Sequence, residues 1–187
     1  MANTRYPAYE LRTAGPEDEK SIEAVDSSFT TGTVFRVEAT DAGFTLTEVP
    51  VDPPLTKVFP EEEPGEGEGD DDGDTAVFVA LDPEEGRVAG FISLTYAAWN
   101  RRVTVEDIEV APEHRGRGVG RALLDRAVEF GREREAGHLW LEVSSVNAPA
   151  IRAYRRMGFA FCGLDTSLYL GTGSEGEQAL FMSRPCP

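Results

Sequence analysis

The first third of the chain alternates between polar and apolar positions in short runs that predict a strand, a helix and a hairpin. Residues 9–13 alternate as a strand does. Apolar residues then recur at spacings of three and four, as on one face of a helix: Ile22, Val25 and Phe29. Residues 34–50 hold two runs suited to strands on either side of a short turn at 41–43. We therefore expect strand, helix and an inserted hairpin over about 34–50.

The middle of the chain predicts three antiparallel strands followed by a crossover. Apolar runs at 75–81, 87–99 and 102–110 are separated by short turns, which is typical of a meander. Apolar residues then form a helical stripe: Val119, Leu123, Ala127 and Phe130. The run at 138–144 predicts a buried strand, and a strand, helix, strand order indicates a parallel pair.

The last third predicts one more helix and two strands. A helix is expected to begin at Asn147, with Pro149 in its first turn, and to stop at Gly158. Strands follow at 159–164 and 178–183. These elements predict an α/β (α+β) fold with a mixed, mostly antiparallel sheet of about six or seven strands and flanking helices. The 187 residues are expected to form one domain, 1–187.

Charge changes the picture of what this chain binds. It carries 34 acidic and 18 basic residues, a net charge of −16, which repels phosphate backbones and anionic lipids and attracts cations. Nine of the acids lie in 61–74, a stretch without apolar residues that predicts a flexible loop inserted in the domain. No run approaches the roughly 18 apolar residues of a membrane span, so we expect a cytoplasmic protein. From the negative charge we expect its partner to be a small cation, not nucleic acid or a membrane.

A glycine-rich segment lies between the strand at 102–110 and the helix that starts near Val119. It reads Arg115-Gly116-Arg117-Gly118-Val119-Gly120. Backbone N–H groups at a helix N-terminus, close glycine backbone and two arginines suit a pyrophosphate. A GxGxxG fingerprint that starts at Gly116 and Gly118 fails because Arg121 occupies the position of its third glycine, and no P-loop Gly-Lys-Ser/Thr is present. An ordinary glycine-rich turn is the alternative.

Two motifs in order resemble those of the GNAT superfamily of N-acetyltransferases. Arg115-x-x-Gly118-x-Gly120 after a strand is similar to its motif A, and a second signature follows about 27 residues later. That second signature consists of Asn147, Ala150, Tyr154 and Gly158-Phe159. The resemblance implies an enzyme that uses acetyl-CoA as co-substrate, without a metal, and a splayed parallel pair of strands that holds it.

The resemblance also implies roles for particular residues. Those it assigns to acetyl-CoA are Ile108, Val110, Arg115, Gly116, Arg117, Gly118, Val119, Gly120, Arg121 and Asn147. Ile108 and Val110 would end a bulged strand and offer backbone groups to the pantetheine arm. Tyr154 matches the tyrosine that protonates the leaving thiolate, although packing beside Ile151 is the alternative. Asn147 alternatively only caps its helix.

The general base is left open among three carboxylates of one strand. Glu106, Asp107 and Glu109 crowd the segment before the glycine-rich loop, and alternation sends Asp107 and Glu109 to one face and Glu106 to the other. Each is a candidate to take the proton of an ammonium, or it is only solvated. His114 and His138 are weaker candidates.

Longer segments resemble one group within the superfamily, the streptothricin (nourseothricin) acetyltransferases of antibiotic resistance. They include 27–35, 51–60, 96–102, 138–165 and 177–187. The resemblance implies acetylation of the β-amino group of the β-lysine moiety of a streptothricin, with Tyr96, Trp99, Asp165 and Tyr169 as guesses for the acceptor pocket. The alternatives are another cationic amine acceptor, such as a polyamine, an aminoglycoside or a protein N-terminus, or a CoA-binding domain without catalysis. A homodimer is left open.

Overall fold

The structure is a computed structural model that describes residues 9–59 and 74–186. Two compact units divide the described residues: one consists of 9–27, 74–140 and 185–186, and the other of 28–59 and 141–184. We call them the first and the second unit. The glycine-rich segment and the three candidate base carboxylates belong to the first unit, whereas Asn147 and Tyr154 belong to the second.

The first unit contains the predicted antiparallel meander. Strands β1 (Glu10–Thr13), β4 (Asp74–Leu81), β5 (Val88–Ala97) and β6 (Arg102–Val110) pair antiparallel in that order. The 61–73 part of the predicted acidic loop lies outside the described residues. Asp74, which was expected to end that loop, is instead the first residue of β4 and forms an ion pair with Arg134.

The predicted helix after the first strand is much shorter than expected. A 3-10 turn (Pro16–Asp18) leads into α1 (Glu19–Glu23), and Phe29, expected on the helix, begins strand β2 (Phe29–Thr40) in the second unit. The intervening Asp26-Ser27-Ser28 explains the difference. Asp and Ser side chains bond to nearby backbone in non-helical conformations, so these residues terminate helices more readily than they extend them.

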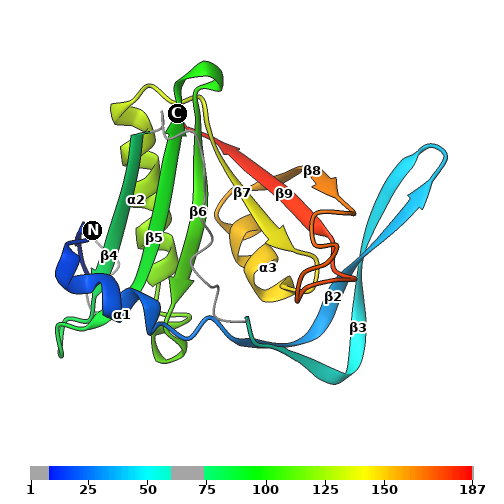
Figure 1. The fold of residues 1–187 in the computed structure, drawn as a ribbon, viewed down its shortest axis with the longest axis horizontal. Coiled ribbons are helices and arrows are strands. Elements are labelled where there is room, and N and C mark those ends of the chain that lie inside the picture. The colour runs from blue at the N-terminus through cyan, green and yellow to red at the C-terminus, as the bar shows by residue number, and fades with distance from the viewer. Residues whose placement is uncertain (1–8, 60–73, 187) are drawn as a thin grey trace. The chain divides into compact units, whose positions relative to one another are not determined.

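Helix α2 (Val119–Glu133) packs its apolar stripe on one face of β4, β5 and β6 (Figure 1). Leu123, Ala127 and Phe130 are buried there, and the Phe130 ring meets that of Phe78 edge-on at 6.2 Å. Close backbone approach is required at Gly90, where a Cβ would lie 2.5 Å from the Glu109 carbonyl oxygen and 3.2 Å from the Val119 side chain. Helix α1 lies on the other side of these strands (Figure 1).

The second unit holds the inserted hairpin and the end of the chain. β2 pairs antiparallel with β3 (Gly43–Lys57) in a two-stranded sheet of its own, so the hairpin predicted at 34–50 is confirmed and longer than expected. Helix α3 (Ala148–Arg156) is followed by β8 (Ala160–Asp165) and β9 (Ala179–Pro185), which pair antiparallel.

The main sheet confirms the predicted fold class. With β7 (His138–Ser144), it has seven strands in the order β1-β4-β5-β6-β7-β9-β8. β6 and β7 are neighbours joined by the crossover helix α2, which makes them the parallel pair of a mostly antiparallel sheet. Within 9–59 and 74–186, no helix is long and apolar enough to cross a membrane.

Candidate functional site

A β-bulge in β6 sets the direction of the candidate base residues. Ser93 of β5 pairs with Asp107, whereas the next residue, Leu94, pairs with Val105, so Glu106 is an extra residue in β6. An extra residue on one strand reverses the alternation of side chains beyond it. The bulge that the family resemblance implied in this strand is therefore present, at Glu106.

Contacts with α2 show which face each side chain takes. Val103, before the bulge, and Val110, after it, both lie against glycines of α2. A Cβ added to Gly131 would be 3.5 Å from the Val103 side chain, and one added to Gly120 would be 3.7 Å from the Val110 side chain. Residues 103 and 110 share a face only because of the bulge. Asp107 and Glu109 consequently extend from the face opposite α2, and the expectation that they share a face is confirmed.

Glu109 has the most perturbed carboxyl group of the three candidates. Burial raises its pKa to about 7, and the negative charges of Asp107 and Asp26 act in the same direction. Arg115 and a hydrogen bond with Ser27 oppose the rise. The side chains of Glu106 and Asp107 are exposed. Glu109 is thus a carboxyl group that changes protonation near neutral pH, as a general base should.

Arg115 is bound to backbone of its own unit. Its Nε donates to the carbonyl oxygen of Val110 at 2.8 Å, and its Nη2 donates to that of Asp26 at 2.6 Å. The guanidinium therefore joins the end of β6 to the segment after α1, beside Glu109. The sequence placed Arg115 in a phosphate loop but gave no sign of these two carbonyl partners.

The glycine-rich segment has the backbone that a phosphate loop needs. Gly116 and Gly118 have φ angles of 73° and 92°, in the left-handed region that favours glycine, and a Cβ at either position would meet no other atom within 4 Å. Gly118 is the N-cap of α2. The N–H groups of Val119, Gly120 and Arg121 follow it, and the first N–H groups of a helix have no partner within that helix.

The remaining polar side chains of this segment are placed differently from one another. Arg117 and Arg121 are exposed. His114 lies in the 3-10 turn (Pro112–His114) before the loop, where its Nδ1 is 3.0 Å from the Tyr9 hydroxyl. His138 begins β7. A role for either histidine as the general base stays a prediction.

In the second unit, Asn147 forms the cap that its alternative interpretation predicted. Its side-chain oxygen accepts a hydrogen bond from the backbone N–H of Ala150 at 3.2 Å, at the start of α3. The carboxamide N–H₂ is not part of that bond. Capping fixes where the helix begins, and a role toward a pantetheine arm stays a prediction.

Tyr154 lies on α3, half-buried. Its ring is tilted against that of Phe159, with the centroids 5.8 Å apart, and Ile151 one turn earlier is fully buried. The ring therefore packs as the alternative interpretation expected. Packing holds the ring in place and leaves the role of the hydroxyl a prediction.

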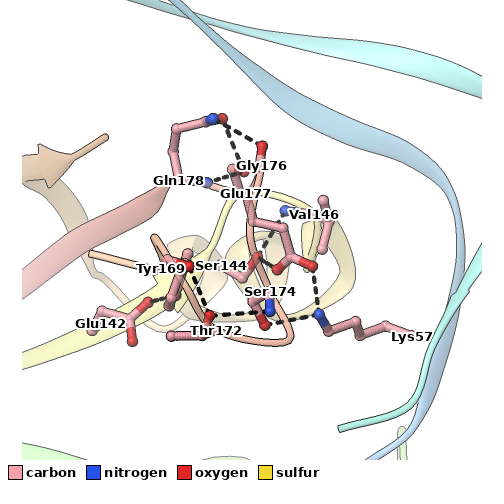
Figure 2. Close-up of polar contacts among 11 residues, drawn as sticks. Lys57, Glu142, Ser144, Val146, Tyr169, Thr172, Ser174, Gly176, Glu177 and Gln178 are labelled. Carbon is pink, nitrogen blue, oxygen red and sulfur yellow. Dashed lines mark hydrogen bonds and ion pairs between the residues drawn. The ribbon is translucent and has the colours of Figure 1, made fainter. Parts of the chain in front are cut away.

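Tyr169, named from the sequence as a guess for the acceptor pocket, belongs to a polar cluster of the second unit that the sequence analysis missed (Figure 2). Tyr169 donates a hydrogen bond to Glu142 of β7, and burial raises the pKa of both groups. Lys57 Nζ lies 2.5 Å from Glu177 Oε1, and Ser144 Oγ donates to Glu177 Oε2 at 2.5 Å. The sequence signal for this cluster was Glu142, a charged residue within the otherwise apolar run of β7, where a buried side chain would need a hydrogen-bond partner.

Two of the guessed acceptor residues, Tyr96 and Trp99, lie in the first unit, near the turn between β5 and β6. Trp99 lies in the 3-10 turn (Ala98–Asn100) between β5 and β6 and is 86% exposed. Tyr96 pairs with Val103 near the same turn, at the opposite end of β6 from Glu109. A role for these two aromatic residues in an acceptor pocket stays a prediction. Within the described ranges, no group of three or more His, Cys, Asp or Glu residues is arranged to hold a metal ion.

Comparisons with known proteins identify the family of this chain. Residues 46–159 match the model of the Acetyltransferase (GNAT) family. The chain is 59% identical to the streptothricin acetyltransferase of Streptomyces lavendulae over 190 residues, which covers all of both chains. Among solved structures, a nourseothricin acetyltransferase is 66% identical with a TM-score of 0.88, over 97% of this chain and all of the other.

A more distant solved structure contains the co-substrate. This Bacillus anthracis protein, in complex with acetyl coenzyme A, is 25% identical with a TM-score of 0.77, over 96% of this chain and 99% of its own. The family match covers more than half of the chain and includes both the bulged strand and the glycine-rich segment. This protein is a member of the GNAT family of acetyltransferases.

Proposed function

We propose that this protein transfers the acetyl group of acetyl-CoA to the β-amino group of the β-lysine moiety of a streptothricin. The observation that carries the proposal is 59% identity with a streptothricin acetyltransferase over the full length of both chains. A net charge of −16 suits an acceptor that is a small polycation. Acetylation would remove one positive charge and one strong donor from the antibiotic.

The glycine-rich segment fits the pyrophosphate of acetyl-CoA. Gly116 and Gly118 give the loop a backbone conformation that residues other than glycine rarely adopt, and the first three N–H groups of α2 follow. A helix N-terminus attracts anions through these groups and through its dipole. Exposed Arg117 and Arg121 add positive charge, whereas Arg115 contributes mainly by bracing Val110, whose N–H we place beside the thioester carbonyl.

Glu109 is the general base of this proposal. Its carboxylate takes the proton from the acceptor ammonium, so that the amine nitrogen has a lone pair for the acetyl carbon. A pKa of about 7 lets Glu109 accept that proton at neutral pH and release it afterwards. Asp107 raises the pKa of Glu109 and stays an alternative base, and Glu106, the extra residue of the bulge, is the third.

Tyr154 is the general acid of this proposal. As the new C–N bond forms and the C–S bond breaks, its hydroxyl gives a proton to the departing sulfur. Asn147 holds the pantetheine arm through the carboxamide N–H₂ that its capping bond leaves unused. Acetyl-CoA supplies the acetyl group, and the chain supplies the base, the acid and the orientation.

One experiment separates this proposal from its alternatives. The protein is incubated with acetyl-CoA and, in turn, streptothricin, spermidine, an aminoglycoside and a peptide with a free N-terminus, while release of free thiol is followed. We expect streptothricin to give the highest kcat/KM, and mass spectrometry with NMR to locate the acetyl group on the β-amino nitrogen. Preference for another amine would replace the substrate, and acetyl-CoA binding without turnover on any amine would indicate a domain without catalysis.

A further inference from the structure

An open hollow in the first unit lies on the same side of the sheet as Glu109. Its volume is about 590 Å³, and its lining combines acidic and apolar groups. Glu19 and Glu23 of α1 and Asp107 of β6 carry the negative charges, whereas Ile22, Val77 and Phe91 are apolar. We call it the acid-rimmed hollow. Among the described residues, its lining includes no lysine or arginine, so the charged groups that line it there are all acidic.

The floor of the acid-rimmed hollow is a row of side chains across three strands. Val77, Ser93 and Asp107 are direct neighbours on β4, β5 and β6. Phe91 and Glu109 form the adjacent pair of the next row. Residues two apart on a strand are about 7 Å apart on one face, so the hollow begins one row from the proposed base.

The rim on the other side is held in a fixed position. Asp18 is 5% exposed; it accepts bonds from Arg12 Nη1 and Nη2 at 2.6 and 2.9 Å and from the backbone N–H of Gly15 at 2.8 Å. The Arg12 hydrogen bond and that of Gly15 hold the pKa of Asp18 below its usual value, so the carboxylate stays charged. The turn that carries α1 is thereby tied to β1, and Glu19, Ile22 and Glu23 share one side of α1.

We propose that the acid-rimmed hollow binds an alkylammonium arm of the acceptor, one that does not react, while the reacting amine faces Glu109. This rests on the proposed function. Methylene groups lie against Ile22, Val77 and Phe91, where they leave water, and the terminal ammonium donates to Glu19, Glu23 or Asp107. A monocation cannot fill the hollow and reach Glu109 together, so the hollow selects acceptors with at least two separated cations.

The test compares two double variants with the same net charge. Glu19→Gln with Glu23→Gln removes two charges from the hollow, and Glu84→Gln with Glu85→Gln removes two from the exposed turn between β4 and β5. Steady-state kinetics with streptothricin and acetyl-CoA are measured at low salt and at 0.5 M NaCl. Calorimetry without acetyl-CoA measures the affinity of each protein for streptothricin and for 1,5-diaminopentane.

The hollow variant should raise KM for streptothricin about five- to thirty-fold at low salt, because each exposed ion pair contributes only a few-fold, and the effect should shrink at high salt. The control should match wild type. Equal KM and equal affinity for streptothricin in the two variants would overturn the role of the hollow without contradicting the acetyltransferase activity. If the wild type acetylates no streptothricin, the proposed function fails, and the affinity for 1,5-diaminopentane tests the hollow separately. Affinity for the diamine lost only in the hollow variant supports the hollow as a cation site, and equal affinity in both variants overturns it.

Discussion

Asp107 and Glu109 extend from one face of β6, and the charge of Asp107 adds to burial in raising the pKa of Glu109 to about 7. This relationship predicts a pH profile. Glu109 must be deprotonated to act as base, so kcat/KM should rise with pH and level off above about 7. Glu109→Gln should lower kcat about 10²- to 10³-fold and remove this limb.

Asp107→Asn is the variant to compare with Glu109→Gln. It should move the rise of kcat/KM to lower pH, because the removal of one negative charge lowers the pKa of Glu109. A limb unchanged in position by Asp107→Asn, or still present in Glu109→Gln, would assign the proton acceptor to another group.

The same carboxyl group should make stability depend on pH. The folded pKa is about 7 against 4.5 for the free group, so the folded state binds the proton more tightly. Its contribution is fully present below about pH 4.5 and is lost as pH rises through 7. Glu109→Gln should therefore raise the free energy of unfolding at pH 8 by about 1 kcal/mol, allowing for solvent screening, and leave it little changed at pH 5. Urea titrations at the two pH values measure this difference.

Gly118 offers a test of the phosphate loop that separates charge from backbone strain. Any side chain at φ 92° is strained, but Asn and Asp tolerate that region and have the same shape. Gly118→Asp should weaken acetyl-CoA binding ten- to a hundred-fold more than Gly118→Asn, because only the former puts a negative charge beside the phosphates. Calorimetric affinities that are the same for both variants would remove the pyrophosphate from this loop.

Tyr154→Phe should separate a catalytic hydroxyl from a packed ring. The ring contact with Phe159 is kept, so the melting temperature and acetyl-CoA affinity should stay near wild type. Loss of the proton donor should lower kcat on the order of 10²-fold and remove the decline of kcat at high pH. Wild-type turnover in this variant would leave Tyr154 as packing alone.

Lys57 and Glu177 should be coupled in stability. Their side chains are only 11% and 14% exposed, and Glu177 also accepts from Ser144 (Figure 2). Lys57→Met leaves a largely buried carboxylate without its cation and should cost about 3 kcal/mol. Adding Glu177→Leu should recover part of that loss, whereas independent sites would give additive losses in a double-mutant cycle of urea titrations.

The elements of this fold follow from sequence patterns wherever burial sets a clear period. The stripe of α2 and the strands of the meander have such a period, and they appear with bounds close to those predicted. The short α1 was overextended because Val25 and Phe29 continued a spacing that Asp26-Ser27-Ser28 interrupts. A run of apolar spacing is weaker evidence than the polar residues inside it.

The candidate site was predictable only in part. Glycines and a helix start indicated the phosphate loop because a positive φ restricts residue type locally. The bond from Tyr169 to Glu142 and the ion pair of Lys57 with Glu177 join residues 27 and 120 positions apart, and no local pattern records such distances. Partners of this kind are set by tertiary packing, which is why Arg115 was assigned a phosphate but not its backbone carbonyls.

The bulge at Glu106 sets which face of the sheet each following side chain of β6 takes. Inserting or removing a single residue there exchanges the two sides of everything from 107 to 110, whatever its chemistry. Without Glu106, Asp107 and Glu109 would turn into the apolar layer under α2, and Ile108 and Val110 would turn outward. The role proposed for Glu109 therefore depends on the number of residues in this strand: a substitution at Glu106 keeps the orientation of residues 107–110, whereas a deletion of one residue reverses it.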